Sequence, residues 1–379
     1  MSDYMICPRC LRKIKKTDLK MVCNVCGKPQ EKPKMGMNPF KNLGIIRKKI
    51  AGGNACQNPE CKGCYVNVKC GMCDKELPPD IAQYSRYLRF SLVAPSGAGK
   101  TVFITTMLQE LSQNARTLKF SLSAMDEETS NYQSINTEIL YNSYTKKTIA
   151  ATGKGDPKVL LWRLQDLNKM SKSYTPSYSL TIFDGAGEDQ ENWESVNCRY
   201  IAESKMIMLL FDPTKLYGVC SRLDQDDFKR AGGNSEVTRA STKKFVDGMI
   251  NYIRKLAGVK VNEKITTPVA VVLGKMDVLR QFFPINSIVF QESGHVKSGH
   301  FIQQEADAVH QEIWDFMELC GDDLSASFNG NFKSWKYFGI SSFGMRPQVN
   351  RMLQQPPQPM RVLDPLIWDL YLEGIVNGK

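Results

Sequence analysis

The sequence predicts an α/β protein, in which a mostly parallel sheet flanked by helices follows two small cysteine-rich modules. From Leu88 onward, apolar runs of strand length alternate with segments of helical periodicity, which is the pattern of a parallel sheet with helical connections. Before Leu88, nine of the 12 cysteines lie within 73 residues, mostly in closely spaced pairs. The chain of 379 residues exceeds one typical domain, so it has room for both parts.

The composition is that of a soluble globular protein. Hydrophobic residues make up 42% of the chain and charged residues 23%. No apolar run approaches the roughly 18–20 residues of a membrane helix, and the N-terminus lacks the pattern of a signal peptide. We therefore expect a cytoplasmic protein with no membrane partner, in which paired cysteines bind metal more often than they form disulfides.

Two cysteine pairs in residues 1–30 predict a first zinc ribbon. Cys7 with Cys10 and Cys23 with Cys26 are separated by twelve residues. Each pair can place two thiolates on one Zn²⁺, and a hairpin between the pairs would complete a tetrahedral four-cysteine site. A module this small buries too little surface to fold alone, so we expect the metal to serve as its core.

A second zinc ribbon is predicted further along, where five cysteines are available for four ligand positions. Cys70 and Cys73 form one clear pair. The other pair is either Cys56 with Cys61 or Cys61 with Cys64. We prefer the first choice, because the second leaves only five residues between the two pairs, which is short for a ribbon hairpin.

Positive charge is concentrated before the sheet. The net charge is +11, and residues 1–93 hold 18 Lys or Arg against 7 Asp or Glu, whereas the rest of the chain is balanced. Residues 31–53 are a basic linker between the first ribbon and the second, which spans residues 54–80. The imbalance predicts an acidic partner, either nucleic acid or an acidic protein face, and the alternative is a solvated basic surface.

A phosphate-binding loop is predicted after the first strand of the sheet. The strand at residues 88–93 is followed by Ala-Pro-Ser-Gly-Ala-Gly-Lys-Thr and then by a helix at residues 101–111. Glycines let backbone N–H groups turn toward phosphate oxygens, and the helix N-terminus adds its positive end. Lys100 can reach the β- and γ-phosphates, and Thr101 can bind Mg²⁺. The residues expected to bind nucleotide in this loop are Ser96, Gly97, Ala98, Gly99, Lys100 and Thr101.

The remaining strands and helices follow in alternation over a domain that we assign to residues 86–379. Strands are expected at residues 118–123, 159–164, 178–183, 206–211, 268–273 and 335–340. Helices are expected at residues 241–256, 301–320 and 364–375, with a helix-prone region at residues 126–147.

Two strand ends carry residues that suit nucleotide chemistry. Asp184 follows the strand at residues 178–183 and can hold Mg²⁺ through water, while Gly187 can offer its N–H to a γ-phosphate. Asp277 follows another apolar strand, and its carboxylate can accept hydrogen bonds from the N1–H and amino groups of guanine, a pair that adenine lacks. The stem of Lys275 can lie along the base plane. The alternative for Asp277 is an ordinary cap of the following helix.

In this order the motifs resemble those of a TRAFAC-clade P-loop GTPase. Residues 94–101 are similar to the phosphate loop, residues 184–188 to the Asp-x-x-Gly motif of switch II, residues 274–277 to the guanine motif, and residues 340–344 to the loop that contacts the base. With the cysteine modules in front, the arrangement is similar to a bacterial double-GTPase group associated with conflict systems. Ala94 stands in place of the first glycine, and Gly274 in place of Asn or Thr.

The resemblance implies a Ras-like fold that binds GTP with Mg²⁺. Ser341 and Ser342 would contact the base, and Thr152, or alternatively Thr148, would be the switch I threonine. Glu188 stands where Ras-like proteins have a water-orienting glutamine, so hydrolysis is expected to be slow, because a carboxylate repels the γ-phosphate. The long spacing between motifs implies insertions near residues 125–150, 214–240 and 281–300.

We therefore expect a regulatory GTPase whose nucleotide state sets its switch conformation and whose ribbons contact a partner protein. The alternatives are a P-loop ATPase that binds nucleic acid through its basic ribbons and a nucleotide-binding scaffold without turnover. Catalysis would depend on Lys100, Asp184, Glu188 and Thr152. The expected cofactors are Mg²⁺, bound by Thr101 and Asp184, and two Zn²⁺.

Overall fold

The computed structural model forms two compact units. It describes residues 3–30, 55–84, 86–95, 97–142, 149, 158–184, 193, 199–223, 239–321, 324–345, 353 and 355–379. The first unit comprises Met1–Tyr87 with Ser177–Ser179, and the second comprises Leu88–Pro176 with Leu180–Lys379. The predicted linker at residues 31–53 lies outside the described residues.

Two small antiparallel sheets build the first unit. The first sheet pairs β1 (Tyr4–Ile6) with β2 (Lys13–Lys15). The second has the order β3 (Lys20–Cys23), β4 (Tyr65–Lys69), β5 (Glu76–Leu77), and two 3₁₀ helices, η1 (Lys16–Asp18) and η2 (Ile81–Gln83), complete the unit. Because β3 precedes residues 31–53 and β4 follows them, the two cysteine-bearing segments share one sheet.

The apolar core of this unit is small. Its buried side chains include Met5, Ile14, Val22, Tyr65 and Val68. A core of this size supplies little of the stability that a domain needs, so cross-links by metal would carry much of it.

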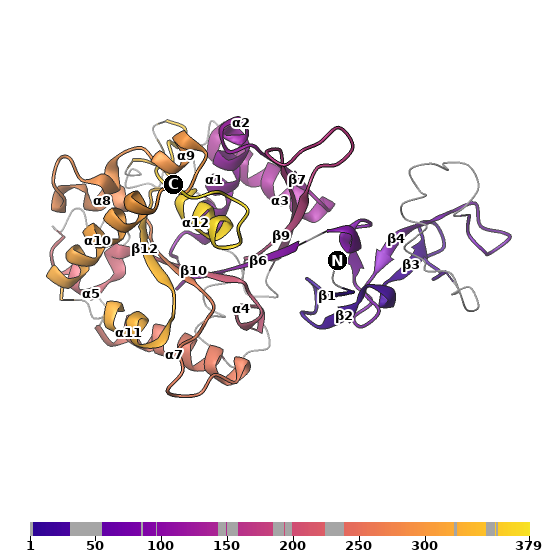
Figure 1. Cartoon of the computed structure of the whole chain (residues 1–379), viewed down its shortest axis with the longest axis horizontal. Helices are drawn as coiled ribbons and strands as arrows, with labels where there is room; N and C mark the ends of the chain where they lie inside the picture. The colour runs from indigo at the N-terminus through magenta and orange to yellow at the C-terminus, as the bar shows by residue number, and fades with distance from the viewer. Residues whose placement is uncertain are drawn as a thin grey trace. The chain divides into compact units, whose positions relative to one another are not determined.

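A seven-stranded sheet forms the centre of the second unit (Figure 1). Its order is β12-β11-β10-β6-β9-β8-β7, and the pairs β6–β10, β10–β11 and β11–β12 are parallel, whereas β7–β8 is antiparallel. The strands are β6 (Arg86–Val93), β7 (Phe120–Ala124), β8 (Lys158–Asp166), β9 (Ser177–Asp184), β10 (Met206–Phe211), β11 (Val269–Leu273) and β12 (Trp335–Gly339). The prediction of a mostly parallel α/β sheet is confirmed.

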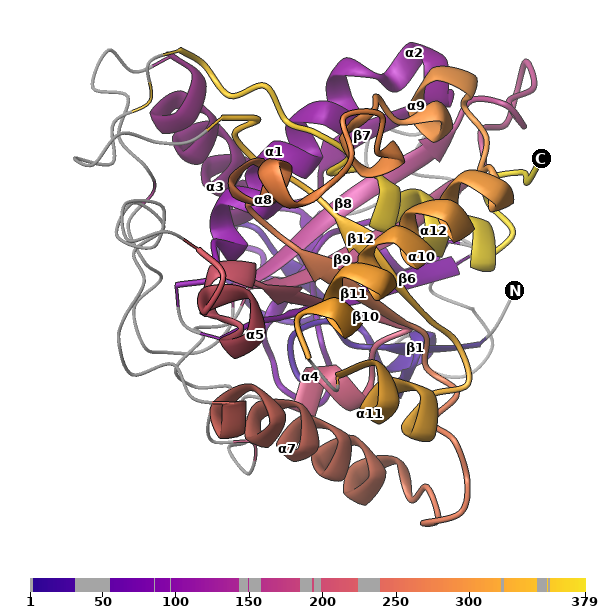
Figure 2. The same ribbon diagram turned by 90° about the vertical axis from the view of Figure 1, so that its left-hand side faces the viewer.

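Helices cover both faces of this sheet. Figure 2 shows α7 and α11 together on one side and α1 and α3 on the other. The longer helices are α1 (Lys100–Gln113), α3 (Glu127–Thr137), α7 (Arg239–Ala257), α10 (Gln303–Leu319), α11 (Leu324–Asn331) and α12 (Asp364–Leu372). The short helical segments are α2 (Ala115–Leu118), η3 (Glu138–Asn142), α4 (Arg199–Ala202), η6 (Pro213–Lys215), α5 (Tyr217–Cys220), α8 (Met276–Leu279), η7 (Arg280–Phe282), η8 (Ile288–Phe290) and α9 (Gly294–Ser298).

Most predicted boundaries differ from the observed ones by one or two residues, and two differences have a clear cause in the backbone. The strand expected to start at residue 118 begins at Phe120, because α2 occupies the preceding residues and ends on Lys119, which has a left-handed φ of 57°. The last helix ends at Leu372 rather than at residue 375, because Gly374, with φ 66°, turns the chain away from the helix. Among the described residues, no helix is both long and apolar enough to cross a bilayer.

Candidate nucleotide site and candidate zinc centres

The phosphate loop connects β6 to α1 and needs its glycines. Gly97 has φ 73°, and Gly99, the N-cap of α1, has φ 91°. Both values lie in the left-handed region that a Cβ disfavours, so glycine allows the loop to curl before the helix starts. The helix then closes from Gly99, whose carbonyl accepts a hydrogen bond from the Phe103 N–H at 2.9 Å. Ser96 lies outside the described residues.

Residues from two predicted motifs meet at the start of α1. The Thr101 hydroxyl donates a hydrogen bond to Asp184 Oδ2 at 3.3 Å, although the two residues are 83 positions apart. The sheet explains the contact, because β9, which ends at Asp184, lies next to β6, which leads into the loop. Lys100 is buried, with 7% of its surface exposed.

Asp184 is a buried carboxylate with one oxygen unsatisfied. Its exposure is 1%, and Tyr132 donates its phenolic hydrogen bond to Oδ2 at 2.9 Å. Oδ1 has no hydrogen-bond partner among the described residues. Burial raises the pKa of Asp184, against the opposing effects of the Tyr132 hydrogen bond and the Lys100 charge. A buried carboxylate oxygen without a donor, beside a threonine hydroxyl at a phosphate loop, fits a hydrated divalent cation.

The expected base-recognition residues lie at the ends of β11 and β12. Ser341 donates a hydrogen bond from Oγ to Asp277 Oδ1 at 2.5 Å, and Ser341 Oγ accepts the Gly344 N–H at 2.9 Å. The N-cap of α8 is Lys275, with φ 51° and no capping side chain, so Asp277 lies in the first turn and does not cap the helix. Ser342 follows in the same loop, with its side chain half-buried.

Lys275 makes a contact that the sequence did not indicate. Its Nζ forms an ion pair with Asp212 Oδ2 at 2.5 Å, and Asp212 is almost fully buried. Asp212 directly follows β10, so the pair joins the ends of two neighbouring parallel strands at the same edge of the sheet. The position of Asp212 directly after an apolar strand was the available signal for its role.

Several expected site residues are not described. Gly187, Glu188, Thr152 and the alternative Thr148 lie outside the described residues, as does Ser96. The structure adds Tyr132 and Asp212 to the site, neither of which belongs to a predicted motif. Tyr132 lies on α3, and only the packing of this helix in the folded chain brings it to the end of β9.

The eight predicted zinc ligands gather into two four-cysteine clusters, but their grouping differs from the prediction. One cluster contains Cys7, Cys10, Cys70 and Cys73, and the other contains Cys23, Cys26, Cys56 and Cys61. The predicted assignment of Cys7, Cys10, Cys23 and Cys26 to one ribbon site and of Cys56, Cys61, Cys70 and Cys73 to the other is therefore wrong. Each cluster takes one pair from each side of residues 31–53.

Strand pairing accounts for the interleaved grouping. β3 ends at Cys23 and pairs with β4, which brings the second cysteine pair to the segment that carries Cys56 and Cys61. Cys64 stays outside both clusters, and its N–H donates to the Asn24 side chain at 2.9 Å. None of the described cysteines forms a disulfide.

The clusters fit zinc in the distances between their sulfur atoms and in the hydrogen bonds that these sulfurs accept. The Sγ–Sγ distances are 3.6 Å for Cys23–Cys61 and 3.5 Å for Cys26–Cys56, close to the ~3.8 Å of a tetrahedral site with Zn–S bonds of about 2.3 Å. Backbone N–H groups donate to sulfur at 3.4 Å, as from Met72 to Cys70, which favours the thiolate that zinc requires.

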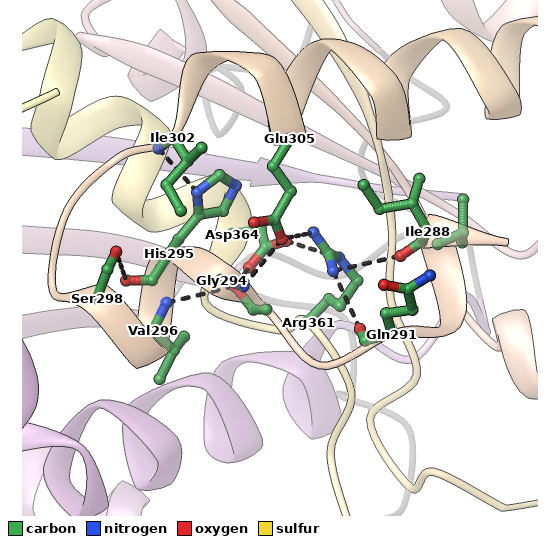
Figure 3. Close-up of polar contacts among 12 residues, drawn as sticks. Ile288, Gln291, Gly294, His295, Val296, Ser298, Ile302, Glu305, Arg361 and Asp364 are labelled. Atoms are coloured by element: carbon green, nitrogen blue, oxygen red, sulfur yellow. Dashed lines mark hydrogen bonds and ion pairs between the residues drawn. The ribbon is translucent and has the colours of Figure 1, made fainter. Parts of the chain in front are cut away.

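A third group of possible metal ligands is an internal salt-bridge network instead. His295, Glu305 and Asp364 lie together, with Arg361 between the two carboxylates (Figure 3). Arg361 pairs with Glu305 at 2.5 Å and with Asp364 at 2.8 Å. His295 Nδ1 accepts the Ile302 N–H at 3.0 Å, so the proton of the neutral ring is on Nε2 and neither nitrogen has a lone pair available for a metal.

Comparison with known proteins finds only distant structural likeness. No protein-family model matches the sequence, and no curated protein matches it. The GTPase-like domain of Ski7 from S. cerevisiae, bound to GTP, is 13% identical, with 69% of this chain and 44% of that chain covered and a TM-score of 0.30. The same domain bound to GDP and inorganic phosphate is 12% identical, with 78% and 51% covered and a TM-score of 0.32.

A third similar structure is Roco2 RocCORdC from Methanosarcina barkeri, bound to GDP. It is 12% identical, with 76% of this chain and 49% of that chain covered and a TM-score of 0.27. This chain thus spans about half the length of the solved chains that it resembles.

Proposed function

We propose that this chain is a Mg²⁺-dependent GTP-binding switch protein of the TRAFAC class of P-loop GTPases, with an N-terminal zinc module that contacts a partner. The observation that carries the proposal is the contact of the Thr101 hydroxyl with Asp184 at the N-terminus of α1. Two motifs far apart in sequence meet there beside a buried, unsatisfied carboxylate oxygen. The order of zinc module and nucleotide domain supports membership of the bacterial double-GTPase group of conflict systems.

Backbone N–H groups and one lysine would bind the phosphates. The left-handed glycines Gly97 and Gly99 leave the loop backbone open toward a ligand, and the N-terminus of the 14-residue helix α1 adds its partial positive charge. Lys100, as the first residue of that helix, would neutralise the β- and γ-phosphates.

Thr101 and Asp184 would hold the magnesium ion, which neutralises charge that develops between the β- and γ-phosphates. Asp184 would act through a water molecule, because its Oδ2 already accepts the hydrogen bond of the Thr101 hydroxyl, which would bind the ion directly. Tyr132 would fix the orientation of the Asp184 carboxylate through its hydrogen bond. Glu188 would orient the attacking water. Thr152, or alternatively Thr148, would be the switch I threonine that contacts Mg²⁺ and the γ-phosphate.

Asp277 would select guanine. Ser341 donates a hydrogen bond to Oδ1 of Asp277 and so orients the carboxylate, whose oxygens would accept the guanine N1–H and amino groups. Lys275 is positioned by Asp212 at the same edge of the sheet, where its stem can cover one face of the base.

The first unit would form a zinc-dependent docking module with two interleaved metal sites. Its partner is proposed to be a protein, and the alternative is a nucleic acid bound by an ATPase. The alternative is favoured by the basic surface, where Lys13 Nζ lies 4.9 Å from the ring centre of the exposed Tyr4. Mobility-shift titrations with single- and double-stranded DNA and RNA, at two salt concentrations, test it directly.

The central experiment is a titration of the full chain with fluorescent GTP and ATP analogues, with and without Mg²⁺. The proposal requires Mg²⁺-dependent binding of GTP that is at least about tenfold tighter than binding of ATP, and loss of both in Lys100→Ala. Absence of nucleotide binding would contradict the proposal, and equal affinity for GTP and ATP would favour the ATPase. Tight GTP binding without phosphate release over hours would favour the scaffold without turnover.

A further inference from the structure

A second lysine, Lys215, reaches the phosphate loop from the side of β6 on which β10 lies, opposite to β9 and Asp184. Lys215 is the last residue of η6, which follows β10 directly. If a Cβ were added to Gly97, it would lie 3.0 Å from Lys215 Nζ. The ammonium group therefore occupies the space that a side chain at Gly97 would need. Strands β10 and β6 are parallel neighbours, which brings their following loops to one edge of the sheet.

The backbone that carries Lys215 is held firmly. Asp212 Oδ1 accepts hydrogen bonds from the Thr214 N–H at 3.0 Å and from the Thr214 hydroxyl at 2.6 Å. The Lys215 N–H donates to the Asp212 carbonyl at 3.0 Å, and Thr214 is fully buried. These hydrogen bonds fix the backbone at Lys215. Less conformational entropy is therefore lost when its ammonium group binds a ligand.

We propose that Lys215 is a further phosphate-binding residue, which contacts the phosphate chain of the nucleotide together with Lys100. The inference rests on the proposed function, because it requires a nucleotide in the loop. A nucleoside triphosphate with one Mg²⁺ keeps net negative charge, and one lysine neutralises only part of it. The ammonium group of Lys215 lies against the backbone of Gly97, in the loop that would surround the phosphate oxygens of the nucleotide.

A purely structural role for Lys215 makes a different prediction. Lys215 follows Asp212 by three residues, and Asp212 also pairs with Lys275 on the side of the base. If Lys215 acted only by supporting this turn, its loss would disturb Asp212 and Lys275 and would change the preference between GTP and ATP. A phosphate contact is independent of the base, so its loss weakens binding of both nucleotides by the same factor.

The test measures the affinities of non-hydrolysable GTP and ATP analogues for the full chain and for the variants Lys215→Ala, Lys215→Gln and Lys215→Arg. We expect about a 10- to 100-fold loss for both analogues in the Ala and Gln variants, with an unchanged ratio between them, and a smaller loss in the Arg variant. Lys297→Ala is the matched control, because Lys297 pairs with Glu292 on the surface, and it should bind as the parent does. Thermal unfolding confirms that each variant is folded.

The outcomes separate the inference from the proposed function. If the parent binds nucleotide and Lys100→Ala does not, but the Lys215 variants bind like the parent, the inference is wrong and the proposed function stands. A changed ratio between GTP and ATP would also overturn the inference, in favour of a structural role through Asp212. If the parent binds no nucleotide, the proposed function is wrong, and the inference is wrong with it because it requires a nucleotide in the loop.

Discussion

Tyr132 donates a hydrogen bond to Asp184 across 2.9 Å and thereby joins helix α3 to the end of strand β9. The helix is itself held in place, since Asp126 caps its start and the Thr129 hydroxyl accepts the Leu161 N–H of β8 at 2.8 Å. The phenol is therefore a fixed donor at the proposed magnesium site. Its position suits a residue that orients the carboxylate without contacting the nucleotide.

The first prediction concerns this hydrogen bond. In Tyr132→Phe, Asp184 keeps its burial but loses its strongest neutral donor, so its carboxylate is less well oriented for the hydrated ion. We expect nucleotide affinity in Mg²⁺ to fall about three- to tenfold, while the weaker binding in EDTA stays the same. Titration of each protein in both buffers measures the difference.

Tyr141→Phe is a suitable control. The Tyr141 hydroxyl has no hydrogen-bond partner among the described residues, so its removal should leave both affinities unchanged. Equal losses with and without Mg²⁺ in Tyr132→Phe would show that Tyr132 supports the fold rather than the metal site.

The interleaved cysteine clusters lead to a second prediction. The double variant Cys10→Ser/Cys73→Ser removes two ligands from one cluster and none from the other. It should therefore lose one zinc of two, and so should Cys26→Ser/Cys56→Ser, which damages only the other cluster. Zinc per chain is measured by elemental analysis after purification under reducing conditions.

Sequential ribbons would give the opposite result for these variants. If the clusters followed the order of the sequence, each double variant would damage both sites and lose both ions. Cys64→Ser should keep two zinc ions, since Cys64 lies outside both clusters. Loss of an ion in Cys64→Ser would show that the second cluster is chosen differently in the protein.

Local sequence patterns anticipated the parts of the molecule that depend on near neighbours. The apolar run before the phosphate loop and the glycines within it determine β6, the loop and α1, so these elements lie where they were expected. The meeting of Thr101 with Asp184 was also foreseeable, because Asp184 ends β9, Thr101 follows the loop after β6, and these two strands are neighbours in the sheet.

Contacts between distant segments were not foreseeable in the same way. The choice of zinc partners depends on β3 pairing with β4 across a linker, and cysteine spacing alone carries no information on that pairing. Tyr132 and Lys215 reach the site through α3 and η6, whose sequences hold no motif. The sequence therefore identifies which residues can be ligands, but not which of them share a site when segments from both sides of a linker pair in one sheet.

A third prediction concerns pH and the helix α10. His310 Nδ1 accepts the Tyr337 N–H of β12 at 3.0 Å, and burial lowers the pKa of His310 from 6.5 to about 4, assisted by the charge of Lys336. The unfolded chain thus binds more protons than the folded protein between these values. The contribution of His310 to the free energy of unfolding is fully present above about pH 6.5 and is lost as the pH decreases toward 4. Because the ring is only partly buried, solvent screening reduces this contribution to about 1–2 kcal/mol.

Urea unfolding at several pH values between 4.5 and 7.5 measures this effect. His310→Gln keeps a group that can accept the Tyr337 N–H but does not titrate, so it should flatten the decrease in stability at acidic pH. Gln311→Ala, at an exposed position of the same helix, should leave the slope unchanged. An identical slope in His310→Gln would mean that other groups cause the acid sensitivity.

The last prediction concerns base choice and the pair Asp277–Ser341. Asp277→Asn replaces a carboxylate oxygen by an NH₂ group that faces the guanine donors or the Ser341 hydroxyl, and either contact is lost. Loss of one partner from a buried, hydrogen-bonded charge typically costs about 2–5 kcal/mol, so GTP affinity should fall more than tenfold. ATP affinity should change little, because adenine makes no use of the carboxylate.

Ser341→Ala separates orientation from recognition at the same place. It leaves the Asp277 carboxylate intact but removes one hydrogen-bond donor that orients it, so GTP affinity should fall by a smaller factor, about three- to tenfold. Asp315→Asn, in an exposed hydrogen bond with Gln311 on α10, controls for the loss of one negative charge. If the parent protein binds GTP and ATP equally and Asp277→Asn changes neither, Asp277 does not recognise guanine. The ATPase alternative would then be preferred, because the phosphate loop alone accepts any nucleoside triphosphate.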